Sequence, residues 1–115
     1  VKAGAIPQFV ALLTLGTAEA KEKAAAALSN LAVDSDNKAP IARAGAIPPL
    51  VGLLTSGTDD AKENAADLLS KLAANSADTK AAIAKAGAIP PLERLAKSGT
   101  GRLKFYATRA LRELG

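Results

Sequence analysis

The stretch AGAIPPLVGLLTSGT, residues 44–58, decides how this chain folds, because close copies of it lie before and after it. Residues 3–17 match it at 11 of 15 positions, and residues 86–100 also match it at 11 of 15. The three copies of its first five residues, AGAIP, begin 41 and 42 residues apart. A period near 40 residues with helical punctuation is typical of an α-solenoid, in which each repeat packs on its neighbours. The sequence therefore predicts stacked repeats, and it directs the search for function to a surface rather than to an active site.

The middle copy predicts a short helix followed by a second helix. Asp36 or Asn37 supplies the N-terminal cap of the short helix, which ends where Gly45 adopts the left-handed conformation that glycine tolerates. Pro48 and Pro49 then open the second helix. The N–H groups in the first turn of a helix have no acceptor within the helix, so proline, which lacks an N–H, loses no hydrogen bond there. Its apolar face is expected to comprise Leu50, Val51, Leu53 and Leu54, and Gly57 is expected to close it.

A third helix is predicted from about residue 59 to residue 74, with Thr58 as its cap and a buried stripe on one side. The stripe consists of Ala65, Leu68, Leu69 and Leu72. The same pattern predicts helices over residues 7–14, 17–33, 79–85, 90–97 and 100–114. The chain is thus expected to be one all-α domain, 1–115, in which a first repeat without its short helix precedes two three-helix repeats. Their approximate limits are 1–35, 36–77 and 78–115.

The composition removes most catalytic chemistry. The chain has no Cys, His, Met or Trp, so thiol nucleophiles, imidazole bases and the common zinc ligand sets are absent. Asp59 and Asp60 are interpreted as capping and dipole residues at a helix start, and the Gly-Thr-Gly at 99–101 lacks the Gly-Lys-Ser/Thr that a phosphate loop requires. We therefore predict no enzymatic activity, no cofactor and no metal site.

The sequence also gives expectations about the compartment of the protein and about whether the chain is part of a longer one. The absence of cysteine fits a reducing, intracellular compartment, cytoplasmic or nuclear. No apolar run approaches the ~18 residues of a membrane span, so no membrane insertion is expected. Because the chain starts at Val1 without an initiator methionine or a signal peptide, it is interpreted as a piece of something longer.

Residues 44–58, together with the AADLLSKLA of residues 65–73 and the AALSNLA of residues 26–32, resemble armadillo repeats over the whole chain. Two-helix HEAT repeats would not need the separate short helices that end at Gly45 and Gly87, and another α-solenoid is the runner-up. The resemblance implies a right-handed superhelix whose third helices line a concave groove for an extended peptide. It also implies the role of a scaffold or adaptor rather than that of a catalyst.

The resemblance also implies which residues face the groove. The asparagine that binds the main chain of the peptide maps onto Asn30, whereas the equivalent positions hold Lys71 and Glu113. The positions of the frequent groove tryptophan hold Ala26, Asp67 and Arg109. Because helix neighbours are three or four residues apart, the groove is expected to be lined by Lys23, Ala26, Asn30, Asn64, Asp67, Lys71, Arg102, Tyr106, Arg109 and Glu113, with Glu22, Glu63 and Phe105 as the alternatives to Lys23, Asn64 and Tyr106. Peptide binding is predicted to be weak, micromolar or poorer. The alternative is a solvated face with the pairs Asp67–Lys71 and Arg109–Glu113.

Charge is concentrated in the last repeat. Residues 85–115 carry seven basic and two acidic side chains, a net charge of +5, whereas the whole chain carries +4. Such a surplus favours acidic partners such as nucleic acid, or it keeps the end of the array soluble. Glu93 and Arg94 stand where the middle copy has Val51 and Gly52, which favours the second interpretation.

The N-terminal repeat is expected to expose apolar surface that a short helix and a preceding repeat would cover. The residues concerned are Phe9, Val10, Leu12 and Leu13. Contiguous apolar surface of this kind usually marks an interface, so a weak homodimer through this face is a further prediction. Leu69 and Leu111 are expected to be buried in the core. A protein-interaction scaffold, a self-associating structural module and a basic binder thus remain the possible functions.

Overall fold

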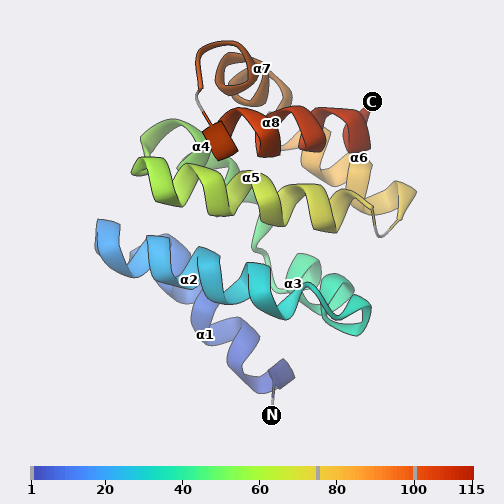
Figure 1. The fold of residues 1–115 in the computed structure, drawn as a ribbon. Coiled ribbons are helices and arrows are strands. Elements are labelled where there is room, and N and C mark those ends of the chain that lie inside the picture. Colours follow the sequence, from blue (N-terminus) through green and yellow to red (C-terminus); the bar gives the residue numbers. More distant parts are fainter. Residues whose placement is uncertain (1, 75, 100) are drawn as a thin grey trace.

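The computed structural model describes residues 2–74, 76–99 and 101–115, and for residues 2–4 it describes the backbone alone. Within these residues the chain is helical and has no strand (Figure 1). A single 3₁₀ turn, η1 (Ser35–Asn37), accompanies the α-helices. In chain order the helices are α1 (Lys2–Leu15), α2 (Ala18–Leu31), α3 (Lys38–Arg43), α4 (Ile47–Ser56), α5 (Asp59–Ala73), α6 (Ala77–Lys85), α7 (Ile89–Ser98) and α8 (Gly101–Leu114).

The third helices of the repeats form the spine of the molecule. Figure 1 shows α2, α5 and α8 as three roughly parallel rods stacked in chain order on the near side. Each of them packs on the next, and α1, α4 and α7 pack on α2, α5 and α8 respectively. The N-terminus lies at the α1 end of the stack and the C-terminus at the α8 end.

The junctions between short and second helices form as predicted in the second and third copies of the repeat. Gly45 and Gly87 have φ angles of 88° and 87°, a region in which a Cβ would clash with the following carbonyl oxygen. Proline then occupies the first turns of α4 and α7. The same pentapeptide therefore makes the same turn twice.

The first copy behaves differently, and its predicted start was wrong. Helix α1 runs unbroken from Lys2 to Leu15 with Pro7 inside it, whereas the sequence predicted a helix over residues 7–14. In the second and third copies the pentapeptide has to turn between two helices. In the first copy the pentapeptide lies inside α1 instead, so the described backbone makes no such turn there.

The starts of the third helices also agree with the sequence where they can be compared. The hydroxyls of Thr17 and Thr58 accept hydrogen bonds from the backbone N–H groups of Ala20 and Ala61, both at 3.1 Å. Each bond satisfies one of the donors left open at a helix start. The equivalent Thr100 lies outside the described residues.

The short helices have caps that the sequence did not predict. The Asn37 side chain makes no capping bond; its amide instead donates to the Leu31 carbonyl at the end of α2, at 2.8 Å. The Asp34 carboxylate caps η1 by accepting from the N–H of Asp36 at 3.0 Å. Helix α6 begins at Ala77 rather than at residue 79, because the Ser76 hydroxyl caps it.

The core contains only small and aliphatic side chains. All four residues of the expected stripe on α5 are fully buried, as are Leu50 and Leu92 of the second helices. Leu111, however, is half-buried, so the expectation that it belongs to the buried core was wrong. No helix in the described part of the chain is long and apolar enough to cross a membrane.

Candidate functional site

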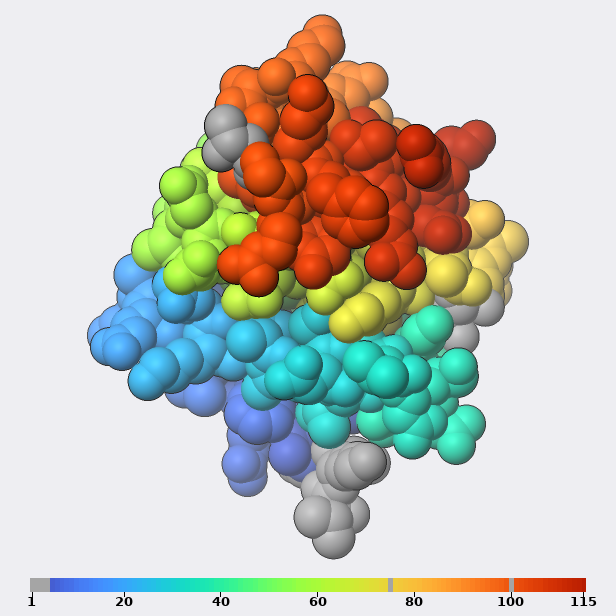
Figure 2. Space-filling view, viewed as in Figure 1, coloured from blue at the N-terminus to red at the C-terminus, as the bar shows by residue number. Residues whose placement is uncertain are grey.

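The residues expected to line the groove lie on the stacked third helices. Figure 2 shows the near face of the stack, on which α2, α5 and α8 form successive bands. On this face the structure places two hollows, one shared by all three helices and one confined to α8. Eight of the ten expected residues lie in these hollows or in a polar network in the middle of the stack, whereas Asn30 and Tyr106 lie in neither.

The shared hollow crosses the three repeats near the starts of their third helices. Its volume is about 320 Å³. It is lined by Glu22, Lys23, Ala26, Asp60, Glu63, Asn64 and Arg102. Four of the ten expected groove residues therefore meet in one place: Lys23, Ala26, Asn64 and Arg102.

Polar contacts between neighbouring repeats shape this shared hollow. Arg102 of α8 pairs with Glu63 of α5 at 3.4 Å. The Thr58 hydroxyl donates to Glu22 of α2 at 2.9 Å. With three carboxylates and two basic side chains, the hollow has a formal charge of −1. Asp60 has no ion-pair partner among the described residues, so its charge is available to a ligand.

A network in the middle of the stack ties α2 to α5. Asp67 and Lys71 form the predicted pair, with Lys71 Nζ 3.1 Å from Asp67 Oδ2. Lys71 Nζ also donates to the Ser29 carbonyl and hydroxyl oxygens, both at 3.0 Å. The Ser29 hydroxyl in turn donates to Asp67 Oδ2 at 2.6 Å.

This arrangement gives Asp67 and Lys71 a structural role beyond the one predicted. Their side chains are only 17% and 21% exposed, and the ammonium satisfies a carbonyl at the end of α2, where the helix dipole favours a cation. Ser29 was missed by the sequence analysis. The repeat of serine at equivalent positions, Ser29 and Ser70, is the sequence feature that could have revealed it.

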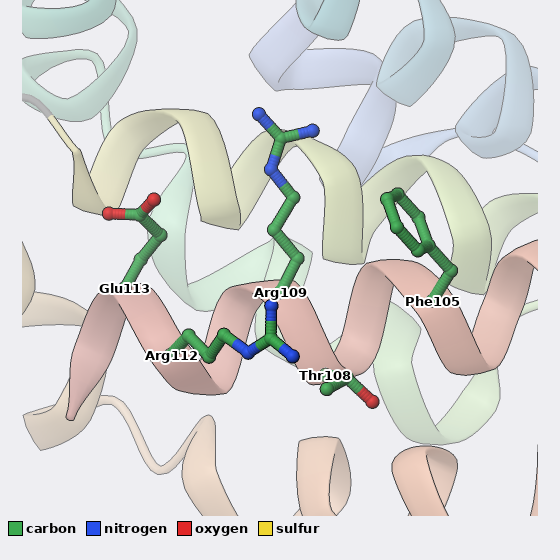
Figure 3. Close-up of a pocket in the computed structure, with 5 residues that line it drawn as sticks. All are labelled: Phe105, Thr108, Arg109, Arg112 and Glu113. Carbon is green, nitrogen blue, oxygen red and sulfur yellow. The ribbon is translucent and has the colours of Figure 1, made fainter.

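The second hollow, the α8 hollow, has a volume of about 350 Å³. It is lined by Phe105, Thr108, Arg109, Arg112 and Glu113 (Figure 3). The predicted pair between Arg109 and Glu113 does not form within 4.0 Å, and Figure 3 shows their charged groups apart. Among the described residues, Arg109 and Arg112 have no ion-pair partner.

Phe105 takes the place expected of Tyr106 at this hollow. Tyr106 is half-buried and packs against the core, with its ring edge-on to that of Phe105 at a centroid distance of 5.5 Å. Phe105 is 59% exposed. Helical spacing alone did not determine which of these two neighbours faces the groove. The packing of α8 against α5 and α7 places Tyr106 against the core and leaves Phe105 at the hollow.

Asn30 lies on the exposed face of α2 but lines neither hollow. Its side chain makes no hydrogen bond within the part of the chain that the structure describes. The amide is thus accessible to a ligand, one helical turn beyond Ala26 in the shared hollow.

The apolar surface expected on the N-terminal repeat is smaller than predicted. Val10 and Leu13 are buried in the chain's own core, so their predicted exposure was wrong. Phe9 is half-buried, whereas Leu12 and Leu15 are exposed. The alternation follows from helical periodicity, since α1 turns one side toward α2 and α4.

Comparison with known proteins agrees with this architecture. The armadillo/beta-catenin-like repeat family matches residues 1–33, 34–74 and 76–115. The chain belongs to this family, and its fold is an armadillo-type right-handed α-solenoid, as the resemblance implied. No curated protein matches the sequence.

Solved structures similar to the chain include designed armadillo repeat proteins. The designed protein YIII(Dq)4CqI is 31% identical with a TM-score of 0.89. A second, YIII(Dq.V1)4CPAF, solved in complex with the peptide (KR)4, is 27% identical with a TM-score of 0.86. A third structure, 30% identical with a TM-score of 0.88, represents proteins computationally designed for modular peptide recognition. The matches cover 97% of this chain and 47% or 48% of the others, so the chain spans about half their length.

Proposed function

We propose that this chain is a non-catalytic protein-binding module that takes an extended peptide across α2, α5 and α8. The observation that carries the proposal is the shared hollow, to which three successive repeats contribute side chains. Armadillo repeats generally serve as scaffolds, and two of the similar designed proteins are described by the peptides they bind or recognise. The residues expected at the groove are the proposed contacts, except Tyr106, which packs against the core.

The size of the stack limits the peptide. Helices packed about 9 Å apart place α2 and α8 roughly 18 Å apart, which about six extended residues cover. A segment this short forms few contacts against the entropy lost on ordering it. We therefore expect dissociation constants in the micromolar range or weaker.

The chemistry of the shared hollow favours a basic side chain in the peptide. Asp60 supplies a carboxylate that has no ion-pair partner among the described residues, and the net charge of the hollow is negative. Asn64, in the hollow, and Asn30, beyond it, offer amides that can bond to the peptide main chain. Lys71 and Asp67 border the path but are already engaged with each other.

Fluorescence anisotropy with labelled (Lys-Arg)4 and (Asp-Glu)4 peptides tests the proposal. We expect the basic peptide to bind, and Asn64→Ala or Asp60→Asn to weaken it by about 2- to 10-fold, the factor a single lost hydrogen bond gives. Asn30→Ala should act in the same direction without unfolding the chain. Arg94→Gln, an exposed change on α7, is the control. Peptide-induced NMR shifts confined to α4 and α7 would contradict the assignment.

A further inference from the structure

One side of each third helix faces the next repeat, and α8 differs there from α2 and α5. The repeat spacing aligns residues 22, 63 and 105, then 25, 66 and 108, then 29, 70 and 112. In α2 and α5 these positions are engaged by the following repeat: Glu22 accepts from Thr58, Ser29 bonds to Asp67 and Lys71, and Glu63 pairs with Arg102. The small side chains between them, Ala25, Ala66 and Ser70, are buried.

On α8 the same three positions hold Phe105, Thr108 and Arg112, which we call the α8 end surface. Phe105 and Arg112 are exposed and Thr108 is half-buried. On α2 and α5 the equivalent positions hold short side chains or a glutamate that the next repeat binds, so the next third helix can approach closely. On α8 a bulky ring and a guanidinium group stand there instead. The α8 end surface therefore differs in size and charge from the equivalent surfaces of α2 and α5.

The second helix of the last repeat supports this interpretation in part. Glu93 replaces the half-buried Val51, and the half-buried Ala96 replaces the buried Leu54, so α7 offers less apolar surface than α4 does. Arg94 carries no weight, because the equivalent Gly52 is itself exposed.

We propose that the α8 end surface, with Arg109 beside it, binds an acidic peptide segment that carries one large aliphatic side chain. Phe105 supplies an exposed ring at one end of the hollow, and Arg109 and Arg112 supply guanidinium groups toward the other. Figure 3 shows the Arg112 side chain lying along α8 toward Thr108, so its guanidinium group lies over the α8 end surface rather than away from it. Carboxylates are natural partners of guanidinium groups, since two parallel hydrogen bonds can form.

The spacing limits how far apart the two side chains of the partner lie. Phe105 and Arg112 are seven positions apart on α8, a rise of about 10 Å between their Cα atoms, and the Arg112 side chain reaches back from there toward Thr108. An extended chain covers at most this distance in about three residues. The fitting segment therefore has an aliphatic residue and, within about three positions on either side of it, Asp or Glu.

A peptide suits this surface better than a nucleic acid does. Glu113 lies at one end of the hollow and would repel a continuous line of phosphates. The α8 end surface is also too short to engage the many phosphates that give nucleic-acid binding its strength. A segment of three or four residues can place a single carboxylate at Arg109 and Arg112, away from Glu113 at the end of the hollow.

The test uses a labelled heptapeptide, SLSDEES, and two matched controls, SASDEES without the aliphatic residue and SLSNQQS without the charges. We expect SLSDEES to bind at least about tenfold more tightly than either control, a difference of about 1.4 kcal/mol. Phe105→Ala and Arg112→Ser should each remove most of this preference; the second restores the serine found at residues 29 and 70. Arg94→Gln should leave it unchanged, as should Asn64→Ala in the shared hollow.

The controls separate this site from the groove and from other occupants. If (Lys-Arg)4 binds in a way that depends on Asn64 but SLSDEES does not bind, the proposed groove stands and the end-surface site is overturned. An affinity for SLSDEES that is unchanged from that of the original chain in both Phe105→Ala and Arg112→Ser would also overturn it. A single-stranded decanucleotide that binds more tightly, depends on Arg112 and weakens steeply with salt would assign the surface to nucleic acid instead. Self-association lost in Arg112→Ser, seen by sedimentation, would assign it to a second copy.

Discussion

Two acid–lysine pairs in this chain have the same spacing along a helix but different surroundings. Glu19 and Lys23 lie 3.4 Å apart, with side chains 77% and 75% exposed. Asp67 and Lys71 lie 3.1 Å apart and are mostly covered, and Lys71 also bonds to Ser29 of the neighbouring repeat. Water screens the first pair, whereas the second joins two repeats. Burial and added hydrogen bonds, rather than sequence spacing, set the contribution of each pair.

We predict that Lys71→Met lowers the free energy of unfolding by about 1 to 3 kcal/mol, because the half-buried Asp67 carboxylate loses its ammonium partner and the Ser29 carbonyl loses a donor. Lys23→Met, the matched control, should change the free energy of unfolding by less than about 1 kcal/mol, the usual limit for an exposed pair. Urea unfolding followed by circular dichroism measures both changes. Equal, small effects would show that the network does not hold α2 to α5.

Glycines provide a second comparison, at the scale of the helical elements. Gly45 sits at the α3–α4 junction with a positive φ, whereas Gly52 lies inside α4, where an added methyl group meets no atom within 4 Å. Gly45→Ala should cost about 1 to 2 kcal/mol, since alanine is strained in the left-handed region. Gly52→Ala should stabilise by about 0.5 to 1 kcal/mol, because alanine loses less conformational freedom in a helix. Shifts of the melting temperature in the same direction would contradict the assigned junction.

Leucine truncations test how the third helices pack. Leu69 is fully buried in the central helix α5, so Leu69→Ala should cost about 2 to 5 kcal/mol. A domain of this size has a total stability of about 5 to 15 kcal/mol, so this variant should be close to unfolding at modest temperature. Leu111→Ala should cost clearly less, since Leu111 is only half-buried. An unchanged melting temperature for Leu69→Ala would contradict the burial of this face of α5.

The helix junctions could be predicted from sequence because their chemistry is local. A left-handed glycine followed by proline at a helix start is determined by a few neighbouring residues, and copies two and three follow the rule. The first copy has the same letters but continues as one helix, since the rule depends on a short helix before the glycine. The Asn37 amide donates to the Leu31 carbonyl six residues earlier, at the end of α2, a bond that the rules for caps at helix starts do not predict.

For the whole molecule, the register of the repeats predicted which residues share a face but not how that face is divided. Lys23, Ala26, Asn64 and Arg102 do meet in one hollow. The bonds from Ser29 to Asp67 and Lys71, however, depend on how two helices 38 to 42 residues apart pack against each other. The expected exposure of Val10 and Leu13 failed for the same reason, because α1 covers them by packing on its neighbours. An intracellular location and a homodimer both stay predictions.

The exposed part of α1 now defines what a homodimer could use. Leu12 and Leu15, with the half-buried Phe9, offer roughly 300 Å² of apolar surface on each copy, so a two-fold dimer buries about 600 Å², a gross gain of about 15 kcal/mol at 25 cal/mol per Å². Association costs an estimated 4 to 15 kcal/mol, which offsets much or all of this gain and leaves a small net free energy of dimerisation. We therefore expect a monomer in dilute solution and a dimer only at high concentration.

Sedimentation across a wide concentration range measures this balance, and the choice of variant follows from burial. Leu13→Glu would place a charge in the core and unfold the repeat, so it cannot report on the interface. Leu12→Glu combined with Leu15→Glu changes exposed residues alone and should abolish self-association while the melting temperature stays the same. Phe9→Glu should weaken association and also lower stability, because this ring is partly packed on the core. A dimer that persists in the double variant would place the interface elsewhere, and a chain that stays monomeric at every concentration would exclude self-association through α1.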